Sequence, residues 1–256
     1  MGQVARRVSD RRLLKLVRAW LRAGVLEGGV TTQTGAGTPQ GSPVSPLLAN
    51  IALHVLDQAW ARGGRSLGVL VRYADDFVIL CPTQQRAEQA RRLVAETLAT
   101  LGLHLHPGKT RVVCLSRGWQ GFDFLGFHHH KVESWRWRGR WYLHRWPADR
   151  AMNAIRAKIR AATDRRFVGH SLAWIVGNLN RVLRGWGAYF RYGNSARKFA
   201  DIDTYVHERL AIFASTKHGL RYHRNWSQRF TWAWLRGLGV YRLSGRVQSG
   251  AAHALR

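Results

Sequence analysis

Apolar positions recur with helical spacing in six segments of the chain. Within each segment, large apolar side chains return every third or fourth residue, which puts them on one face of a helix. These segments are residues 8–23, 45–55, 87–101, 149–163, 179–192 and 201–214. For the helix that starts near residue 45, we expect Ser45 as the N-cap, Pro46 at the first helical position, and a buried face made of Leu48, Ile51, Ala52 and Val55.

Short runs of β-formers between these segments predict strands. Residues 69–71 and 77–80 read as two buried strands joined by a tight turn. Further strands are expected at 103–105 and 111–115, a tight hairpin at 121–127, and a hairpin at 131–143 that turns at Arg138-Gly139. Helices mixed with antiparallel hairpins predict an α+β fold, while the tail from residue 226 shows no clear pattern.

The helix expected at 179–192 carries two different faces. Leu179, Leu183, Trp186 and Phe190 form one apolar stripe, whereas Arg181, Arg184 and Arg191 fall on a separate face with Ala188 between them. The stripe should anchor the helix in a core. The arginines are either an RNA-binding face or ordinary solvated surface.

Charge points to a polyanionic partner. The 41 Lys and Arg outnumber the 14 Asp and Glu, for a formal net charge of +27. Nucleic acid is the first candidate and an anionic membrane surface the second. The net charge is +8 over residues 1–115 and +19 over residues 116–256. We therefore expect the second of these parts to bind the polyanion. Ten of the 12 Trp lie from Trp119 onward, and most are expected in the core.

The remaining composition excludes several classes of protein. Cys81 and Cys114 lie in apolar runs, predict reduced core thiols, and form no C-x-x-C pair for zinc. Residues His128 to His130 cannot converge on one ion, because neighbouring strand residues point to opposite sides. No apolar run reaches transmembrane length and no signal peptide is recognisable, so we expect a cytoplasmic protein with no membrane partner.

Asp75 and Asp76 stand between the two apolar runs of 69–80. Two neighbouring carboxylates at a hairpin tip repel each other, and we expect the strands beneath to desolvate them. Bound Mg²⁺, which prefers carboxylate oxygens, would relieve both costs. The other interpretation is an ordinary turn, since Asp favours turns through local hydrogen bonds.

Four motifs in order resemble the palm of the group II intron-encoded reverse transcriptase/maturase family. They read GTPQGSPVSPLLANI, RYADDF, GLHLHPGKT and FDFLGF. Further on, LNRVLRGWGAYFR and GLGVYRLSG resemble that family's thumb, or maturase-specific X domain. The resemblance runs from about Val8 to Gly245. It implies a partial palm over residues 1–146 and a mostly helical thumb over 147–256.

The resemblance implies a role for each matching residue. Asp75 and Asp76 would hold Mg²⁺ for in-line phosphoryl transfer, and Lys109 would lie near the leaving pyrophosphate. The substrate-binding residues implied are Gln40, Gly41, Ser42 and Tyr73 for nucleotide and template, and Phe124, Leu125 and Gly126 for the primer end. The implied partners are group II intron RNA, an RNA–DNA template-primer and deoxynucleoside triphosphates.

One departure from the family's pattern concerns the upstream palm aspartate. The family takes a further metal-binding Asp from a strand before the GTPQGSP loop, whereas only Asp10 and Glu27 precede that loop here. We therefore expect a C-terminal part of the enzyme, inactive in polymerisation alone, with a separate N-terminal fragment as a candidate partner. The alternatives are a non-catalytic RNA-binding splicing factor and another Y-A-D-D reverse transcriptase, of the retron or diversity-generating type.

Overall fold

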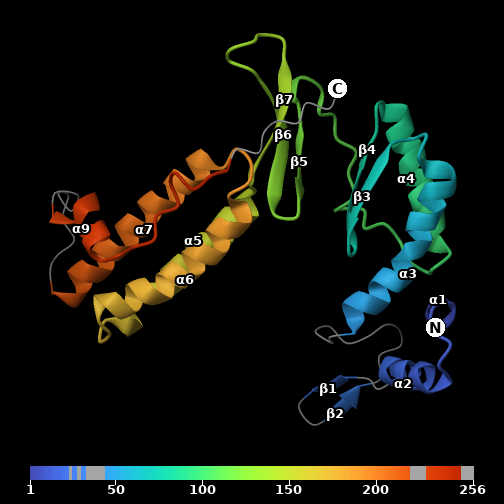
Figure 1. Ribbon diagram of the computed structural model, residues 1–256, viewed down its shortest axis with the longest axis horizontal. Helices are drawn as coiled ribbons and strands as arrows, with labels where there is room; N and C mark the ends of the chain where they lie inside the picture. The colour runs from blue at the N-terminus through green and yellow to red at the C-terminus, as the bar shows by residue number, and fades with distance from the viewer. Residues whose placement is uncertain (23–24, 28–29, 33–43, 220–228, 249–256) are drawn as a thin grey trace. The chain divides into compact units, whose positions relative to one another are not determined.

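The protein divides into two compact units, Met1–Val112 and Val113–Arg256. The computed structural model describes residues 1–256 except 23–24, 28–29, 33–43, 220–228 and 249–256 (Figure 1). Both units combine helices with antiparallel strands, so the α+β fold class is confirmed. The boundary expected between the partial palm and the thumb, at residues 146 and 147, stays a prediction.

The first unit packs two helices against a β-hairpin. Its elements are α1 (Gly2–Ala5), α2 (Arg11–Arg22), β1 (Val25–Glu27), β2 (Val30–Thr32), α3 (Ser45–Ala59), the π-helical turn η1 (Trp60–Gly64), β3 (Val69–Tyr73), β4 (Asp76–Leu80) and α4 (Gln84–Ala99). β1 pairs with β2 and β3 with β4, both antiparallel. The buried core joins α3 and η1 to α4 and consists of Leu56, Trp60, Ala90, Val94 and Leu98.

Local sequence accounts for the ends of the helices. Asp10 precedes α2, and its Oδ1 accepts the N–H of Arg12 at 2.7 Å. Thr83 caps α4 in the same way, accepting the N–H of Arg86 at 3.2 Å. Gly102 follows α4 with φ of +70°, as expected for a residue that closes a helix. The helix predicted over residues 87–101 is confirmed, and it buries one face made of Ala90, Val94, Thr97 and Leu98.

Two expectations for α3 were wrong. Its N-cap is Val44 rather than Ser45, so the helix starts one residue earlier than expected. Its packing face is Leu53, Leu56 and Trp60, while Leu48, Ile51, Ala52 and Val55 are only half-buried. The helix is apolar on more than one side. Its orientation is therefore set by α4 and the hairpin, which the spacing of α3 alone cannot reveal.

The strands of the first unit also differ from expectation. Residues 103–105 and 111–115 form no strand, although Leu105 packs on the core and residues 106–110 make a turn. A strand needs a hydrogen-bonded neighbour, and no described segment pairs with these residues. The β3–β4 hairpin forms as predicted, but it is not buried on both faces, because Val69, Val71 and Tyr73 are exposed.

The second unit joins a three-stranded sheet to a helical bundle (Figure 1). Its elements are η2 (Ser116–Gly118), β5 (Gly121–Phe124), β6 (Phe127–Glu133), β7 (Trp141–Pro147), α5 (Asp149–Ala162), η3 (Arg165–Phe167), α6 (Leu172–Phe190), α7 (Ala196–Lys217) and α9 (Trp232–Gly237). The strand order is β5-β6-β7, and both pairs are antiparallel.

Both hairpins predicted in the second unit are confirmed. Leu125 and Gly126 form the two-residue turn between β5 and β6 with φ of +49° and +78°, and Gly139 has φ of +81° in the β6–β7 loop. The histidines alternate as expected, with His128 bonded to Asp123 at 2.6 Å and His129 stacked on Phe122. Among the described residues, no group of three metal-ligating side chains forms.

The bundle buries the apolar faces of α5, α6 and α7. The predicted face of α5 is confirmed, since Met152, Ile155 and Ile159 are buried. In α6, Leu179, Leu183 and Phe190 are buried and Trp186 is half-buried. Both later helices are longer than expected. α6 starts at Leu172, where Ser171 accepts the N–H of Trp174, and α7 extends to Lys217.

The cysteines and tryptophans are less buried than expected. Cys81 is half-buried against the first core, whereas Cys114 is exposed, and both are free thiols. Of the tryptophans that the structure describes, only Trp60 is buried. The exposed ones are Trp20, Trp119, Trp135, Trp137, Trp174 and Trp232. No helix in the described ranges is long and apolar enough to cross a membrane.

Candidate functional site

The turn of the β3–β4 hairpin presents two carboxylates to solvent. Tyr73 pairs with Asp76, which leaves Ala74 and Asp75 as the turn, with φ of +53° at Ala74. Asp75 and Asp76 are both exposed, so the expected desolvation by the strands was wrong. Neither side chain has a hydrogen-bond or ion-pair partner within the described part of the chain.

These carboxylates fit a divalent cation. Mg²⁺ keeps several waters and is held by one or two carboxylates together with substrate phosphates, rather than by a closed protein cage. Exposed, unpaired oxygens on adjacent residues suit that mode of binding. Because both groups are open to water, an incoming phosphate could share the same ion. The hairpin tip is therefore a candidate Mg²⁺ site.

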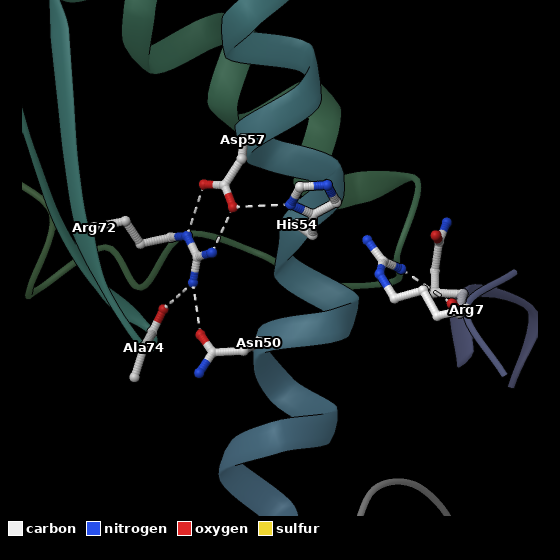
Figure 2. Close-up of polar contacts among 7 residues, drawn as sticks. Arg7, Asn50, His54, Asp57, Arg72 and Ala74 are labelled. Atoms are coloured by element: carbon white, nitrogen blue, oxygen red, sulfur yellow. Dashed lines mark hydrogen bonds and ion pairs between the residues drawn. The ribbon is translucent and has the colours of Figure 1, made fainter.

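Arg72 ties this hairpin to α3 (Figure 2). Its Nε and Nη2 donate to the two carboxylate oxygens of Asp57 at 2.9 and 2.5 Å, a fork that matches the planar guanidinium. Its Nη1 donates to Asn50 Oδ1 at 2.9 Å and to the carbonyl oxygen of Ala74 at 2.8 Å. Arg72 thus holds the turn residue directly before Asp75.

Charge and burial strengthen the four hydrogen bonds of Arg72, which we call the lock. The Arg72 side chain is 13% exposed and the Asp57 side chain 33%. The hydrogen bonds from Arg72 hold the pKa of Asp57 below its usual value, and the same bonds raise the pKa of Arg72. His54 adds a contact to Asp57 at 3.4 Å. Sequence reasoning missed Arg72 and Asp57. The two residues are 15 positions apart on different elements, and no local pattern indicates that they pair.

Lys109 lies in the same unit, on the turn that follows α4. The backbone N–H groups of Lys109 and Thr110 both donate to the carbonyl of His106, at 3.1 and 3.0 Å. Lys109 is exposed, and in the described residues no hydrogen bond or ion pair joins it to Asp75 or Asp76. The expected Gln40, Gly41 and Ser42 lie outside the described residues.

The β5–β6 turn carries the residues expected at the primer end. The carbonyl of Leu125 accepts the Tyr189 hydroxyl at 2.9 Å, and the carbonyl of Gly126 accepts the N–H of Ala148 at 2.9 Å. A Cβ on Gly126 would lie 3.4 Å from Phe190, so the turn packs closely on the end of α6. Phe124 ends β5 directly before this turn. The bundle therefore holds the turn in one conformation.

A basic and aromatic cleft lies between α6 and the C-terminal segment. It has a volume of about 320 Å³ and is lined by Gly187, Ala188, Arg191, Tyr241, Gly245, Arg246, Val247 and Gln248. The guanidinium carbons of Arg184 and Arg246 lie 5.5 and 4.4 Å from the centroid of the Tyr241 ring. Guanidinium groups beside a ring can pair with phosphates and stack on bases.

Long-range hydrogen bonds build this cleft. Asn180 in α6 donates to the carbonyl of Gly239 at 2.8 Å and accepts the N–H of Tyr241 at 2.6 Å. The buried carboxylate of Asp203 in α7 accepts the N–H groups of Leu243 and Ser244 at 2.9 and 2.8 Å. A buried carboxylate satisfied in this way fixes the backbone. The segment that carries Tyr241 and Arg246 is thus anchored to two helices.

The three arginines expected to bind RNA lie in different places relative to the cleft. Arg184 lies over the Tyr241 ring without lining the cleft. Arg191 lines it, although Arg191 is half-buried at the C-cap of α6 and donates to the Tyr192 hydroxyl at 2.7 Å. Arg181 instead bonds to Asn178 and lines no part of the cleft. Arg246 and Tyr241 were missed, although Tyr241 lies in the GLGVYRLSG motif and Arg246 directly follows that motif.

Together, an exposed carboxylate pair on a β-hairpin and a basic cleft on a helical bundle are the features of a polymerase-palm fold followed by a basic helical domain. Comparison with known proteins agrees with this class. The model described as reverse transcriptase (RNA-dependent DNA polymerase) matches residues 5–129, and the model of the group II intron maturase-specific domain matches residues 152–236. The chain belongs to the group II intron-encoded reverse transcriptase/maturase family.

Two relatives match parts of the chain. Protein YkfC of Escherichia coli (strain K12) is 32% identical over 158 aligned residues, which cover 49% of this chain and 41% of YkfC. The group II intron-encoded protein LtrA of Lactococcus lactis subsp. cremoris is 43% identical over 58 residues, 23% of this chain and 10% of LtrA. The chain therefore matches less than half the length of either relative.

Proposed function

We propose that this chain binds group II intron RNA and assists its splicing, and that its carboxylate hairpin serves RNA-directed DNA synthesis. The observation that carries the proposal is the cleft lined by Arg191, Arg246 and Tyr241, with the guanidinium groups of Arg184 and Arg246 lying over the Tyr241 ring. Arginine with an aromatic ring is a pattern typical of RNA recognition. The family membership and the +27 charge support the same partner.

The hairpin supplies the proposed catalytic part. Asp75 and Asp76 would hold Mg²⁺, which when bound neutralises phosphate charge and activates the attacking hydroxyl. Arg72 would position the turn, since it holds the carbonyl before Asp75. Lys109 would offset charge on the leaving pyrophosphate. The template-primer and deoxynucleoside triphosphates are the proposed substrates, with the β5–β6 turn at the primer end.

A separate polypeptide is a proposed partner for DNA synthesis. Of the carboxylates before residue 45, Asp10 is engaged in capping α2 through its Oδ1. A polypeptide bearing the family's upstream palm aspartate should therefore raise primer extension in a mixture with this chain. Asp75→Asn should abolish that gain. Extension that is equal with and without the second polypeptide would contradict this partnership.

Splicing of a group II intron precursor RNA tests the main proposal. At a Mg²⁺ concentration where the RNA splices slowly alone, the full chain should raise the rate. The Arg184→Gln, Arg246→Gln double variant should lose most of this effect. Asp75→Asn should keep it, because RNA binding by the cleft does not use the hairpin. If the parent chain accelerates no splicing, the proposal is refuted.

Primer extension distinguishes the catalytic proposal from a purely non-catalytic splicing factor. On the catalytic reading, Asp75→Asn separates the two activities, removing extension and sparing splicing. A protein that supports splicing but never extends a primer, even with the second polypeptide present, would be the non-catalytic factor.

A further inference from the structure

Residues 134–140 form the loop at the end of the β6–β7 hairpin (Figure 1). This loop carries two exposed tryptophans, Trp135 and Trp137. It reads SWRWRGR. The Trp135 side chain is 93% exposed and that of Trp137 is 54% exposed. Exposing the apolar surface of an indole to water costs free energy. A ring exposed this far is therefore a candidate contact surface. We call residues 134–140 the tip.

The tip is a defined structure. Across its base, the Ser134 N–H donates to the carbonyl of Arg140 at 2.8 Å, and the Arg140 N–H donates to the carbonyl of Trp137 at 3.1 Å. Ser134 Oγ accepts the N–H of Trp137 at 3.1 Å, and Glu133 accepts the N–H of Gly139 at 2.7 Å. These bonds fix the backbone that carries both tryptophans, which lowers the entropy lost on binding.

The tip carries three arginines, two of which lie beside the Trp137 ring. The guanidinium carbons of Arg136 and Arg140 lie 5.9 and 5.4 Å from the centroid of the Trp137 ring, and Arg138 is exposed between them. The nearest acidic residue along the chain, Glu133, is engaged in holding the turn. Trp135 makes no ring contact with any described residue, so both of its faces are open.

We propose that the tip binds unpaired nucleobases of RNA, with Trp135 and Trp137 stacking on bases and the arginines pairing with the flanking phosphates. The proposal rests on RNA being the partner, as proposed above, and adds a second contact besides the cleft. Indole faces interleaved with guanidinium groups are the chemistry that single-stranded nucleic acid requires. A paired duplex hides its base faces and should gain little from the tip.

A membrane interface is the rival occupant, because Trp and Arg also favour lipid headgroups. Interfacial anchors, however, present a broad face of Leu, Phe and Trp to the acyl boundary. Apart from its two indoles, the tip contains only Ser, Arg and Gly. Its apolar surface is confined to two rings with charges on each side, which favours nucleobases.

Fluorescence anisotropy on the full chain tests the proposal with two labelled probes, a single-stranded oligouridine and a blunt RNA duplex of equal length. The Trp135→Ala, Trp137→Ala double variant should bind oligouridine about tenfold more weakly or worse, while duplex binding stays nearly unchanged. Trp119→Ala is the matched control, because Trp119 is 76% exposed but lies outside the tip. It should bind both probes like the parent.

The arginines should act through charge. Arg136→Gln with Arg138→Gln should flatten the dependence of log affinity on log salt for oligouridine by about 0.7 per lost phosphate contact. The tryptophan double variant should keep the parent's slope, since its phosphate contacts remain. Melting temperatures should not change, because the side chains removed are exposed.

Three outcomes would overturn the proposal. If the tryptophan variant binds oligouridine like the parent, the tip is no base site, while the proposed function stands. If it loses binding to anionic phospholipid vesicles but keeps oligouridine, the tip is a membrane contact. If the parent binds neither oligouridine nor intron RNA, the proposed function fails, and the proposal for the tip fails with it.

Discussion

Replacing Arg72 by lysine should loosen the hairpin that carries Asp75 and Asp76. Arg72 makes four hydrogen bonds from three nitrogens, two of them to the carboxylate of Asp57. Lysine keeps the positive charge but cannot form the fork, so at least two bonds are lost. A net bond to a charged group contributes about 1.5–3 kcal/mol, and a neutral one about 1 kcal/mol.

Solvent exposure lowers the combined contribution of the lost hydrogen bonds. Asp57 is 33% exposed, so water replaces part of what the guanidinium provided. We therefore expect Arg72→Lys to reduce the local free energy of opening by about 2 kcal/mol. Since 1.4 kcal/mol corresponds to a factor of ten, backbone amides of β3 and β4 should exchange with solvent roughly 30-fold faster.

Hydrogen–deuterium exchange measured by mass spectrometry on peptides covering residues 69–80 gives this quantity directly. Arg91→Lys is the matched control, because Arg91 pairs with Glu88 on an exposed face of α4. Such a pair contributes under about 0.5 kcal/mol, so exchange should change less than about threefold. If Arg72→Lys accelerates exchange at 69–80 no more than Arg91→Lys does, the lock does not stabilise the hairpin.

Three further predictions follow from burial and charge. Asp75→Asn should weaken binding of Mn²⁺, as a probe for Mg²⁺, by more than about tenfold in a titration, whereas Asp10→Asn should not. Leu183→Ala should destabilise the second unit by about 2–5 kcal/mol in chemical denaturation, with Arg181→Ala near zero. The pKa of Asp57 is lowered on folding, so the Asp57 carboxylate should contribute fully to folding stability well above about pH 4. That contribution should be lost as the pH falls toward the folded pKa. Hydrogen exchange at residues 69–80 that does not rise on acidification, relative to intrinsic rates, would contradict this.

Local signals in the sequence were enough to predict the hairpins and most helices. The turns at Leu125-Gly126 and Arg138-Gly139 need a positive φ, and glycine supplies it within two residues of chain. Caps such as Thr83 act over three residues. The apolar faces of α4 and α5 are unambiguous, because their other faces are polar.

Features that depend on distant partners could not be predicted. α3 is apolar on more than one side, so only its neighbours decide that Leu56 is buried. The Arg72–Asp57 fork joins two elements, and neither residue type reveals its partner. In the second unit, Asn180 and Asp203 reach about 40 to 60 residues along the chain to hold the C-terminal segment. The cleft exists only because of those contacts.

The salt dependence of intron RNA binding by the full chain tests whether the cleft binds RNA. Arg184→Gln with Arg246→Gln removes the two charges that lie over the Tyr241 ring of the cleft, and Lys158→Gln with Arg160→Gln removes two exposed charges from α5 as the control. The cleft variant should reduce the slope of log affinity against log salt by about 1.4, at 0.7 per phosphate contact, and the control should leave it nearly unchanged. Equal losses in the two variants would mean that RNA binds through diffuse charge, and the account of the cleft would be wrong.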